Sequence, residues 1–497
     1  MRTIHFRQLF FCPILSWPVV ESRWLDRRTA SASGLENKFV SVAHSCRAIT
    51  KSFRREWRQV SATMTAASRT ALGDDETSLD TFSLDHVAYP KLPLALIAVL
   101  VLLFLPEELS FFIADLRLSP QRAILLMLAP IVAAQLARKI RAGRYRFVAS
   151  DLFVPLTASW MFIGTTVTYD FGDALKHSGP IALEYFVAYM AARVLLSKPK
   201  QSLVFVSWLC VIISIVVIDG LVDTSMGSYV THEVLGQITG YSVVAYNGDS
   251  FRLGLLRAAG PLEHPILLGF TCAIGLLIAC AVDVALRPFC VVFCALGVAI
   301  AFSSAPQQSV IMGFGLMAYG RLTAAMPGRW MLLVGLGAIF VAVVFATVDS
   351  PFGHIIAAMT MTPATGFFRL YIWNGLGPLV LDSPYFGVPQ LVSNQVYRGS
   401  IDSLWLLLSL QYGVPCAVFA GLAMIGACSR PTRGPRASLT YSESRLGTAL
   451  GIIIFLIILA GFTVHFWGST WILIALLVGL RAHLGELAAL NATAGAV

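Results

Sequence analysis

Apolar residues follow one another in twelve blocks of near-spanning length from Lys91 onward. A helix of about 20 apolar residues crosses a bilayer, and it satisfies its backbone hydrogen bonds internally, as the hydrocarbon core requires. The pattern therefore predicts an all-α, polytopic transmembrane helical bundle with twelve spans. We place the spans at 92–112, 120–137, 148–168, 179–197, 202–219, 264–285, 288–304, 308–320, 330–348, 403–427, 447–465 and 469–484.

One pair of blocks departs from the simple pattern. The block at 308–320 is short, and the block before it ends in Ser303-Ser304-Ala305-Pro306. Irregular backbone at membrane depth is tolerated where protein surrounds it or a cavity adjoins it. We therefore expect 288–304 and 308–320 to form a broken or re-entrant pair.

Composition supports lipid as the solvent of most of the chain. Hydrophobic residues make up 57% and charged residues 13% of the 497 residues, whereas soluble domains carry about 25% charged residues. The stretch from Glu21 to Asp85 differs, because it is rich in Ser, Thr, Arg and Asp and lacks helical periodicity. We expect a disordered, basic cytoplasmic tail at 1–90, a transmembrane domain at 91–485 and a short cytoplasmic tail at 486–497. Translation from Met64 would give a shorter chain.

The net charge of +9 does not indicate a nucleic-acid partner. Residues 1–63 hold eleven Lys and Arg against four Asp and Glu, so most of the excess charge lies in the tail. The remainder lies beside predicted spans, where it indicates topology. The cysteines lie mostly in apolar blocks, and none forms a CxxC pair or a metal-ligand cluster. We interpret them as core residues and expect no metal site.

Basic residues mark alternate connections between the predicted spans. Loops rich in Lys and Arg resist translocation and stay in the cytoplasm. One assignment satisfies the pattern: a multi-pass protein of the cell inner membrane with both termini cytoplasmic and two long connections, 220–263 and 349–402, on the outer face. The basic clusters that fix this orientation lie at 138–146, 193–200, 287, 321–329, 430–445 and 481.

The two long connections are where we look for function, because long loops in compact proteins are uncommon unless they bind or react. Against the positive-inside trend, they carry Arg252, Arg257, Arg369 and Arg398. Such a set fits an anionic ligand at the outer face. The alternative is that these side chains are solvated or extend to lipid headgroups.

Three short motifs lie in or beside these loops, and each combines charged residues with glycine or proline near the start of a predicted span. They are Arg257-Ala-Ala-Gly260 continuing to Glu263-His264-Pro265; Arg369 and Trp373 followed by Pro384-Tyr385-Phe386-Gly387; and Asp402-Ser403 followed by Gly413. An arginine, a carboxylate and an imidazole at a membrane surface can bind an anion and move a proton.

Together these motifs resemble those of the O-antigen ligase/polymerase superfamily, over approximately residues 90–485. The resemblance implies a fold like that of the C-type glycosyltransferases, and glycosyl transfer outside the inner membrane without metal or other cofactor. Its implied partners are a polyprenyl-diphosphate-linked glycan donor and acceptor, membrane lipids, and a flippase and chain-length regulator as companions. The third motif has Asp402 where ligases that act on lipid A-core present histidine, which is more similar to exopolysaccharide polymerases.

The expected activity is therefore polymerisation of lipid-linked repeat units into exopolysaccharide or O-antigen. Without a metal, guanidinium groups must compensate the charge of the diphosphate leaving group. We assign Arg257 and Arg369 to this role, with Arg398 and Arg252 in reserve. Trp373 and Tyr385 are candidates for stacking on sugar rings, and the aromatic belt of the interface is their alternative role.

Asp402 is the candidate base for the acceptor hydroxyl, since partial desolvation raises the pKa of a carboxylate. Its alternative role is to cap the helix that follows. Glu263 and His264 are further catalytic candidates, and a structural hydrogen bond is the alternative for His264.

Two other functions compete with a polymerase. An O-antigen ligase would transfer finished glycan to lipid A-core. A twelve-span transporter or flippase would bind substrate near the bilayer midplane through broken helices related by an internal repeat. The sequence has no convincing half-to-half repeat, which favours the enzyme.

Overall fold

The computed structural model describes residues 91–113, 116–198, 200–244, 246, 250–348, 363–388, 401–429 and 439–494. The chain separates into two units, Met1–Val87 and Ala88–Val497, and every described residue belongs to the second. The predictions for the tail at 1–90, for Met64 and for Arg398 fall outside the described residues.

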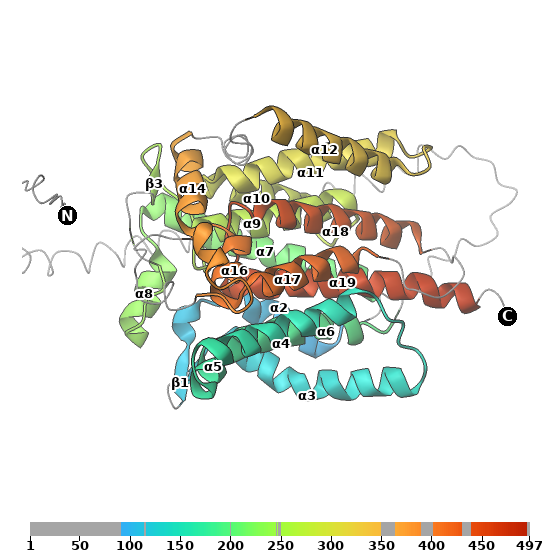
Figure 1. Cartoon of the computed structure of the whole chain (residues 1–497), viewed down its shortest axis with the longest axis horizontal. Coiled ribbons are helices and arrows are strands. Elements are labelled where there is room, and N and C mark those ends of the chain that lie inside the picture. Colours follow the sequence, from blue (N-terminus) through green and yellow to red (C-terminus); the bar gives the residue numbers. More distant parts are fainter. Residues whose placement is uncertain are drawn as a thin grey trace, which may run out of the picture. The chain divides into compact units, whose positions relative to one another are not determined.

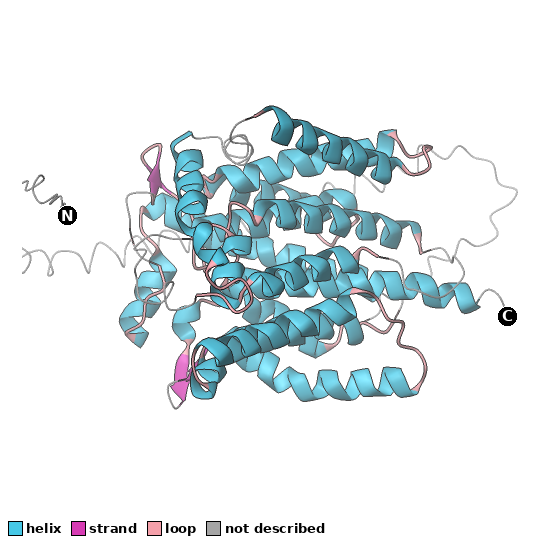
Figure 2. Cartoon of the chain, in the orientation of Figure 1, coloured by secondary structure: helices cyan, strands magenta, loops and turns pink. Residues whose placement is uncertain are grey.

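The described part of the chain is a bundle of α-helices with two small antiparallel hairpins at one end (Figures 1 and 2). The hairpins pair β1 (Phe111–Ile113) with β2 (Leu116–Leu118), and β3 (Phe251–Arg252) with β4 (Leu255–Leu256). The helices are α2 (Leu94–Leu103), η1 (Glu107–Leu109), α3 (Pro120–Arg141), α4 (Ser150–Thr168), α5 (Phe171–Lys176), α6 (Ser178–Val194), α7 (Gln201–Met226), α8 (Val230–Thr239), α9 (Pro265–Ala281), α10 (Arg287–Ile300), α11 (Ser304–Leu322), α12 (Arg329–Thr347), α14 (Pro363–Leu376), η2 (Pro378–Leu381), α16 (Leu404–Tyr412), α17 (Val414–Ala427), α18 (Tyr441–Ala460) and α19 (Gly468–Ala494).

Every predicted block contains a helix, which confirms the all-α architecture. Five described helices, α3, α7, α12, α18 and α19, are long and apolar enough to cross a membrane. The protein is therefore a multi-pass membrane protein. We call the end of the bundle that carries the hairpins, α8 and α14 the loop end (Figure 1).

Several boundaries differ from the predicted blocks. The first block ends early, because α2 stops at Leu103 and the chain continues into η1 and β1. The sequence predicts a break near 304–308. The structure has a turn at 301–303 instead, and the helices on either side of it, α10 and α11, are each uninterrupted. The block at 403–427 is divided at Gly413, where φ is 87°, into α16 and α17. The last helix, α19, continues past 484 to Ala494.

Two of the longer helices, α3 and α18, begin where their sequences supply caps. Ser119 precedes α3 and accepts a hydrogen bond from the Arg122 amide at 3.3 Å. Pro120 occupies the first turn, where the N–H that proline lacks would have no helical acceptor. Thr440 and Glu443 form a reciprocal capping box at the start of α18. Local sequence therefore fixes where these helices start, and packing between helices fixes the rest.

Close helix packing in the centre depends on small residues. Gly479 of α19 faces the backbone carbonyl of Tyr189 in α6, so a side chain at this position would collide with that carbonyl. In the same helix pair, the rings of Tyr185 and Trp471 stack with centroids 4.5 Å apart. Small residues allow membrane helices to approach closely and gain dispersion contacts. The α6–α19 pair thus forms a central part of the core.

The cysteines behave as the sequence predicts. The seven described cysteines are free, and five of them are buried. Cys294 lies against Gly275 and Cys272 against Gly297, so these thiols fill space between α9 and α10. Their role is packing.

The end of the bundle opposite the loop end is joined by a buried ionic network around Arg193, which is 0% exposed. Its guanidinium donates to both carboxylate oxygens of Asp151 at 3.1 Å, to Glu486 at 2.5 Å and to the carbonyl of Arg146 at 2.5 Å. Lys139 also contacts Glu486 at 3.4 Å. The network joins α3, α4, α6 and α19, and we call this region the Arg193 end.

Replacement of Arg193 is expected to destabilise the bundle. Arg193→Ala leaves Asp151 and Glu486 buried without their main cation, and removal of one partner from a buried pair costs about 3–5 kcal/mol. The midpoint of thermal unfolding in detergent should fall well below that of wild type. Arg287→Ala is the control, since Arg287 pairs with Asp283 in an exposed position, where such pairs contribute about 0–1 kcal/mol. Equal shifts for the two variants would contradict this assignment.

Candidate functional site

The first motif begins on the β3–β4 hairpin. Leu253 and Gly254 connect its strands with φ values of 55° and 78°, which is the positive-φ pair of a tight two-residue hairpin turn. This turn positions Arg252 on one strand and leads the chain directly to Arg257. The Arg252 side chain is half-buried, and Arg257 is buried.

Both arginines hold the turn between α10 and α11. Arg252 donates from Nη1 to the carbonyl of Phe302 at 2.8 Å, and Arg257 donates from Nε to the carbonyl of Ala301 at 3.2 Å. Phe302 has a φ of 43°, a conformation that L-residues rarely adopt and that surrounding contacts must maintain. The strained turn and the two guanidinium groups are therefore parts of one structure.

The rest of the first motif is fixed against α7 and α9. Gly260 has a φ of 57°, and its amide donates to Asp223 Oδ2 at 2.8 Å. His264 caps α9 through Nδ1, which accepts from the Ile266 amide at 3.2 Å. Its ring lies beside Trp467, with centroids 5.7 Å apart. The structural hydrogen bond proposed as the alternative role of His264 is therefore present.

The second motif lies on α14 at the loop end. Ile372 is buried against Leu406 and Leu410 of α16. Trp373 donates from Nε1 to the carbonyl of Phe462 at 3.0 Å. These contacts attach α14 across α16 and the end of α18, and they bury Arg369 to 4% exposure.

Arg369 is a charged group in an unusual position. Burial lowers the pKa of its guanidinium, nearby Asp402 opposes that shift, and nearby Arg252 adds to it. The group remains charged, because arginine does not lose its proton in proteins. Its Nε and Nη1 groups have no hydrogen-bond partner among the described residues. Such unpaired buried donors are rare in native structures and need a functional explanation.

The third motif brings Asp402 to the same place, as its electrostatic effect on Arg369 shows. The cap of α16 is Ser403, whose Oγ accepts from the Leu406 amide at 3.3 Å and donates to the Gly461 carbonyl at 3.1 Å. The alternative role of Asp402 as the helix cap is therefore wrong. Ser403, and not Asp402, occupies the N-cap position from which a side-chain oxygen reaches the first free amides of the helix.

Each glycine of the second and third motifs packs against the backbone of the segment that carries the other. Gly387 and Gly413 have φ values of 78° and 87°. A side chain on Gly387 would collide with the carbonyl of Leu410, and one on Gly413 would collide with the carbonyl of Tyr385. The turn before Gly387 and the break between α16 and α17 therefore fit together backbone to backbone.

Tyr385 contributes mainly through its backbone. Its carbonyl and that of Tyr412 both accept from Trp160 Nε1 at 3.1 Å, whereas its side chain is 67% exposed. The indole thereby joins the turn before Gly387 to the end of α16. The exposed ring of Tyr385 is available to a ligand. Among the described residues, it makes no contact with Arg369.

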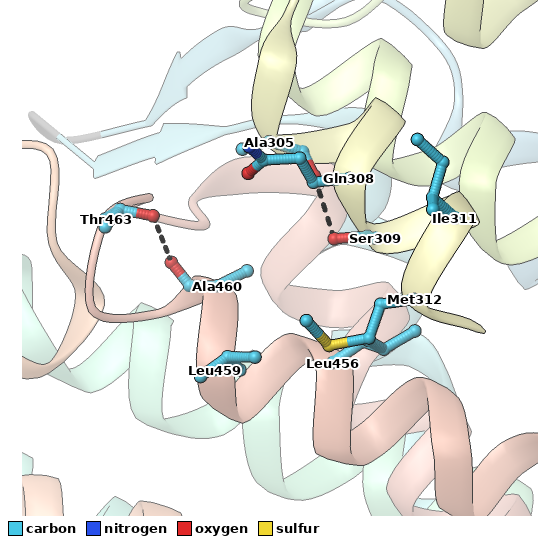
Figure 3. A pocket seen from close by; sticks show the side chains of 9 residues that line it. All are labelled: Ala305, Gln308, Ser309, Ile311, Met312, Leu456, Leu459, Ala460 and Thr463. Atoms are coloured by element: carbon cyan, nitrogen blue, oxygen red, sulfur yellow. Dashed lines mark hydrogen bonds between the residues drawn. The ribbon is translucent and has the colours of Figure 1, made fainter. Parts of the chain in front are cut away.

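An apolar groove of 380 Å³ lies between α11 and α18 (Figure 3). Its walls are formed mainly by Ala305, Gln308, Met312, Leu456, Ala460 and Thr463. One wall starts directly after the turn held by Arg252 and Arg257. The other ends at the turn that accepts hydrogen bonds from Ser403 and Trp373. The groove therefore shares its boundaries with the segments that carry the charged residues.

Glu263 belongs to a second group of residues, which the sequence analysis missed. We define the carboxylate cluster as Glu107, Arg117, Gln121, Arg122, Glu184, Glu263 and Ser469. Arg117 pairs with Glu107, and Arg122 donates to Glu184 at 2.5 Å. The available signal was that Arg117 lies in the connection between the first two predicted spans and Arg122 at the start of the second span, both toward the face assigned as outer and against the positive-inside trend.

A comparison of the sequence with protein-family models and with curated proteins gave no match. The chemistry of the site therefore carries the functional argument. Arg252 and Asp402 lie within electrostatic reach of Arg369, and Arg257 holds the same turn as Arg252 beside the apolar groove, so these groups are suited to an amphiphilic anion. Among the described residues, no group of three or more His, Cys, Asp or Glu side chains could hold a metal ion.

Gly413→Ala tests whether the close packing of Gly413 against the Tyr385 carbonyl supports the site. The new Cβ would collide with the Tyr385 carbonyl, and φ of 87° strains any L-residue, so we expect a loss of at least about 1–3 kcal/mol in stability. Thermal unfolding measures the effect. Gly315→Ala is the matched control, because nothing lies within 4 Å of its Cβ position. A Gly413→Ala variant as stable as the control would refute the contact.

Proposed function

We propose that this protein is a membrane glycosyltransferase that polymerises polyprenyl-diphosphate-linked oligosaccharide repeat units into exopolysaccharide or O-antigen. In this proposal, the loop end faces the periplasm, the chain crosses the inner membrane twelve times as the sequence pattern predicts, and both termini are cytoplasmic. The buried guanidinium of Arg369, with two N–H groups unpartnered among the described residues, is the observation that supports it most directly.

A diphosphate is the ligand class that suits the arginines. Guanidinium groups bind phosphate oxygens with paired, charge-assisted hydrogen bonds, and they stay protonated at every physiological pH. Arg369 and Arg252 lie close enough to affect each other electrostatically, and an anion between them would relieve their repulsion. Arg257 holds the neighbouring carbonyl of the same turn. These groups would stabilise the negative charge that develops on the leaving diphosphate.

The groove between α11 and α18 supports a lipid-linked substrate. It begins at the turn held by Arg252 and Arg257 and is lined mainly by apolar side chains (Figure 3). A polyprenyl chain placed there would leave its diphosphate at the charged segments. Burial of hydrocarbon contributes about 25 cal/mol per Å² in water, and the gain is smaller beside lipid, so the groove would orient the substrate more than it would bind it.

The reaction proposed needs one base. An acceptor sugar hydroxyl attacks the anomeric carbon of the donor, the bond from that carbon to the diphosphate oxygen breaks, and its electron pair leaves with the diphosphate. Asp402 takes the proton of the attacking hydroxyl. It suits this role because it lies near Arg369, and because Ser403, its neighbour, carries the capping function.

A ligase and a transporter remain the competing functions. Asp402 in place of the histidine of ligases favours a polymerase. The break between α16 and α17 is a feature that transporters share, and it is the one observation here that favours that alternative. A strain without this protein distinguishes them, since loss of a polymerase leaves lipid-linked single repeat units outside the membrane, whereas loss of a flippase leaves them inside.

Replacement of the arginines tests the diphosphate site. Arg369→Ala and Arg257→Ala should each lower polymer synthesis by about 100-fold or more, because each removes a preorganised donor to the developing charge. Arg369→Lys should retain more activity than Arg369→Ala, since it keeps the charge but loses the paired geometry. Polymer length on gels and membrane content by immunoblot provide the measurements.

Arg144→Ala is the matched control for these arginine variants, since Arg144 is exposed away from the loop end. It should make polymer of normal length. Normal polymer in both Arg369→Ala and Arg257→Ala would exclude the diphosphate site.

Asp402→Asn tests the base. The amide keeps the size of the side chain but cannot accept the hydroxyl proton, so synthesis should fall by about 100-fold or more. The exposed Asp382 at the same end supplies the control Asp382→Asn, which should remain active. An Asp402→Asn variant with activity near wild type would show that another group takes the proton.

A further inference from the structure

The carboxylate cluster at the loop end has an odd number of acidic groups. It is assembled from η1, β2, α3, α6, the loop before α9 and the start of α19. Arg117 pairs with Glu107, and Arg122 pairs with Glu184, so two carboxylates have a guanidinium each. Glu263 is the fifth charged group of the cluster and has no cation partner among the described residues.

Glu263 is bound to α19 through one oxygen only. Its Oε1 accepts from the amide and from the hydroxyl of Ser469, both at 3.2 Å. Its Oε2 has no partner among the described residues, and the side chain is buried, with 6% of the residue exposed. An ionised carboxylate in this position would be a buried charge without compensation, which is strongly unfavourable.

A second buried atom of the cluster also lacks a partner among the described residues. Gln121 is 2% exposed and donates from Nε2 to the Ser469 hydroxyl at 3.3 Å, while its Oε1 has no partner among the described residues. Gln121, Ser469 and Glu263 therefore form a hydrogen-bonded series. At each end of this series one oxygen, Oε1 of Gln121 and Oε2 of Glu263, accepts no hydrogen bond from the described residues.

Glu107 faces Glu263 across Gly468. A Cβ on Gly468 would fall against Oε1 of both carboxyl groups, and Gly468 has a φ of 52°. Two carboxyl groups so close do not both ionise readily, because like charges in a buried site repel. Since Glu107 has its charge fixed by Arg117, the proton belongs on Glu263.

We propose that Glu263 is a proton-binding site, whose bound proton holds the loop at 257–264 against η1 and the start of α19. Release of the proton would place a negative charge beside Glu107 and weaken the attachment of the loop that carries Arg257. This proposal is independent of the proposed function, because the pH dependence of thermal unfolding tests it in the absence of substrate.

The direction of the pH effect follows from the environment of Glu263. Burial first, and then the neighbouring Glu107, raise the pKa of this carboxyl group from 4.5 to about 8, while hydrogen bonds from Ser469 oppose the shift. The folded protein therefore binds the proton more tightly than the unfolded chain does. The stabilisation is fully present below the unfolded pKa and is lost as pH rises through the folded pKa.

The test compares thermal unfolding of the full-length protein in one detergent across this pH range. Glu263→Gln mimics the protonated form, so its midpoint should equal that of wild type near pH 5 and should exceed it increasingly up to about pH 8. Asp283→Asn is the control, since Asp283 is an exposed carboxylate outside the cluster that pairs with Arg287. Its midpoint should follow that of wild type across the whole pH range.

Ser469→Ala provides a second, independent measurement that keeps the carboxyl group in place. It removes a hydrogen bond to Glu263 that favours the ionised form, so the folded-state pKa should rise and the decline of stability should continue to a higher pH than in wild type. Parallel profiles for wild type and Glu263→Gln would overturn the proposal. An unchanged decline in Ser469→Ala would overturn it equally, even if Glu263→Gln failed to fold.

Discussion

Burial of the Arg369 guanidinium costs free energy that the described residues do not fully offset, and this imbalance shapes the loop end. Desolvation opposes the charged form, and the nearby Arg252 increases the cost. Asp402 supplies only part of the compensation, and two N–H groups lack partners among the described residues. Ligand oxygens from an anion would complete the hydrogen bonds of this group and neutralise its charge, which is the basis of the proposed diphosphate site.

The remaining structure positions this charge. The side chains of Arg252 and Arg257 hold the strained turn at Phe302. Close backbone packing around Gly387 and Gly413 holds the second and third motifs together. The buried network of Arg193 joins four helices at the opposite end of the bundle. Ionic pairing therefore joins segments at both ends of the bundle, and at the loop end the Arg369 guanidinium keeps two N–H groups without a partner among the described residues.

The sequence predicts much of this arrangement, because apolar block length and glycine position are local signals. It locates the helices and selects Arg369 and Asp402 through the motifs that contain them, and Arg252 as one of the arginines of the outer loops. It does not predict that Ser403 rather than Asp402 caps α16, because adjacent residues compete for a cap and only geometry decides. Nor does it predict the carboxylate cluster, whose members come from six separate segments and meet only in the folded protein.

Binding of a lipid diphosphate tests the central claim most directly. The purified protein in nanodiscs would be titrated with undecaprenyl diphosphate and, separately, with uncharged undecaprenol of the same chain length. If an incompletely paired guanidinium site defines the loop end, the diphosphate should bind about 10-fold or more tightly than the alcohol, a difference of about 1.4 kcal/mol or more. Equal affinity for the two lipids would contradict the account.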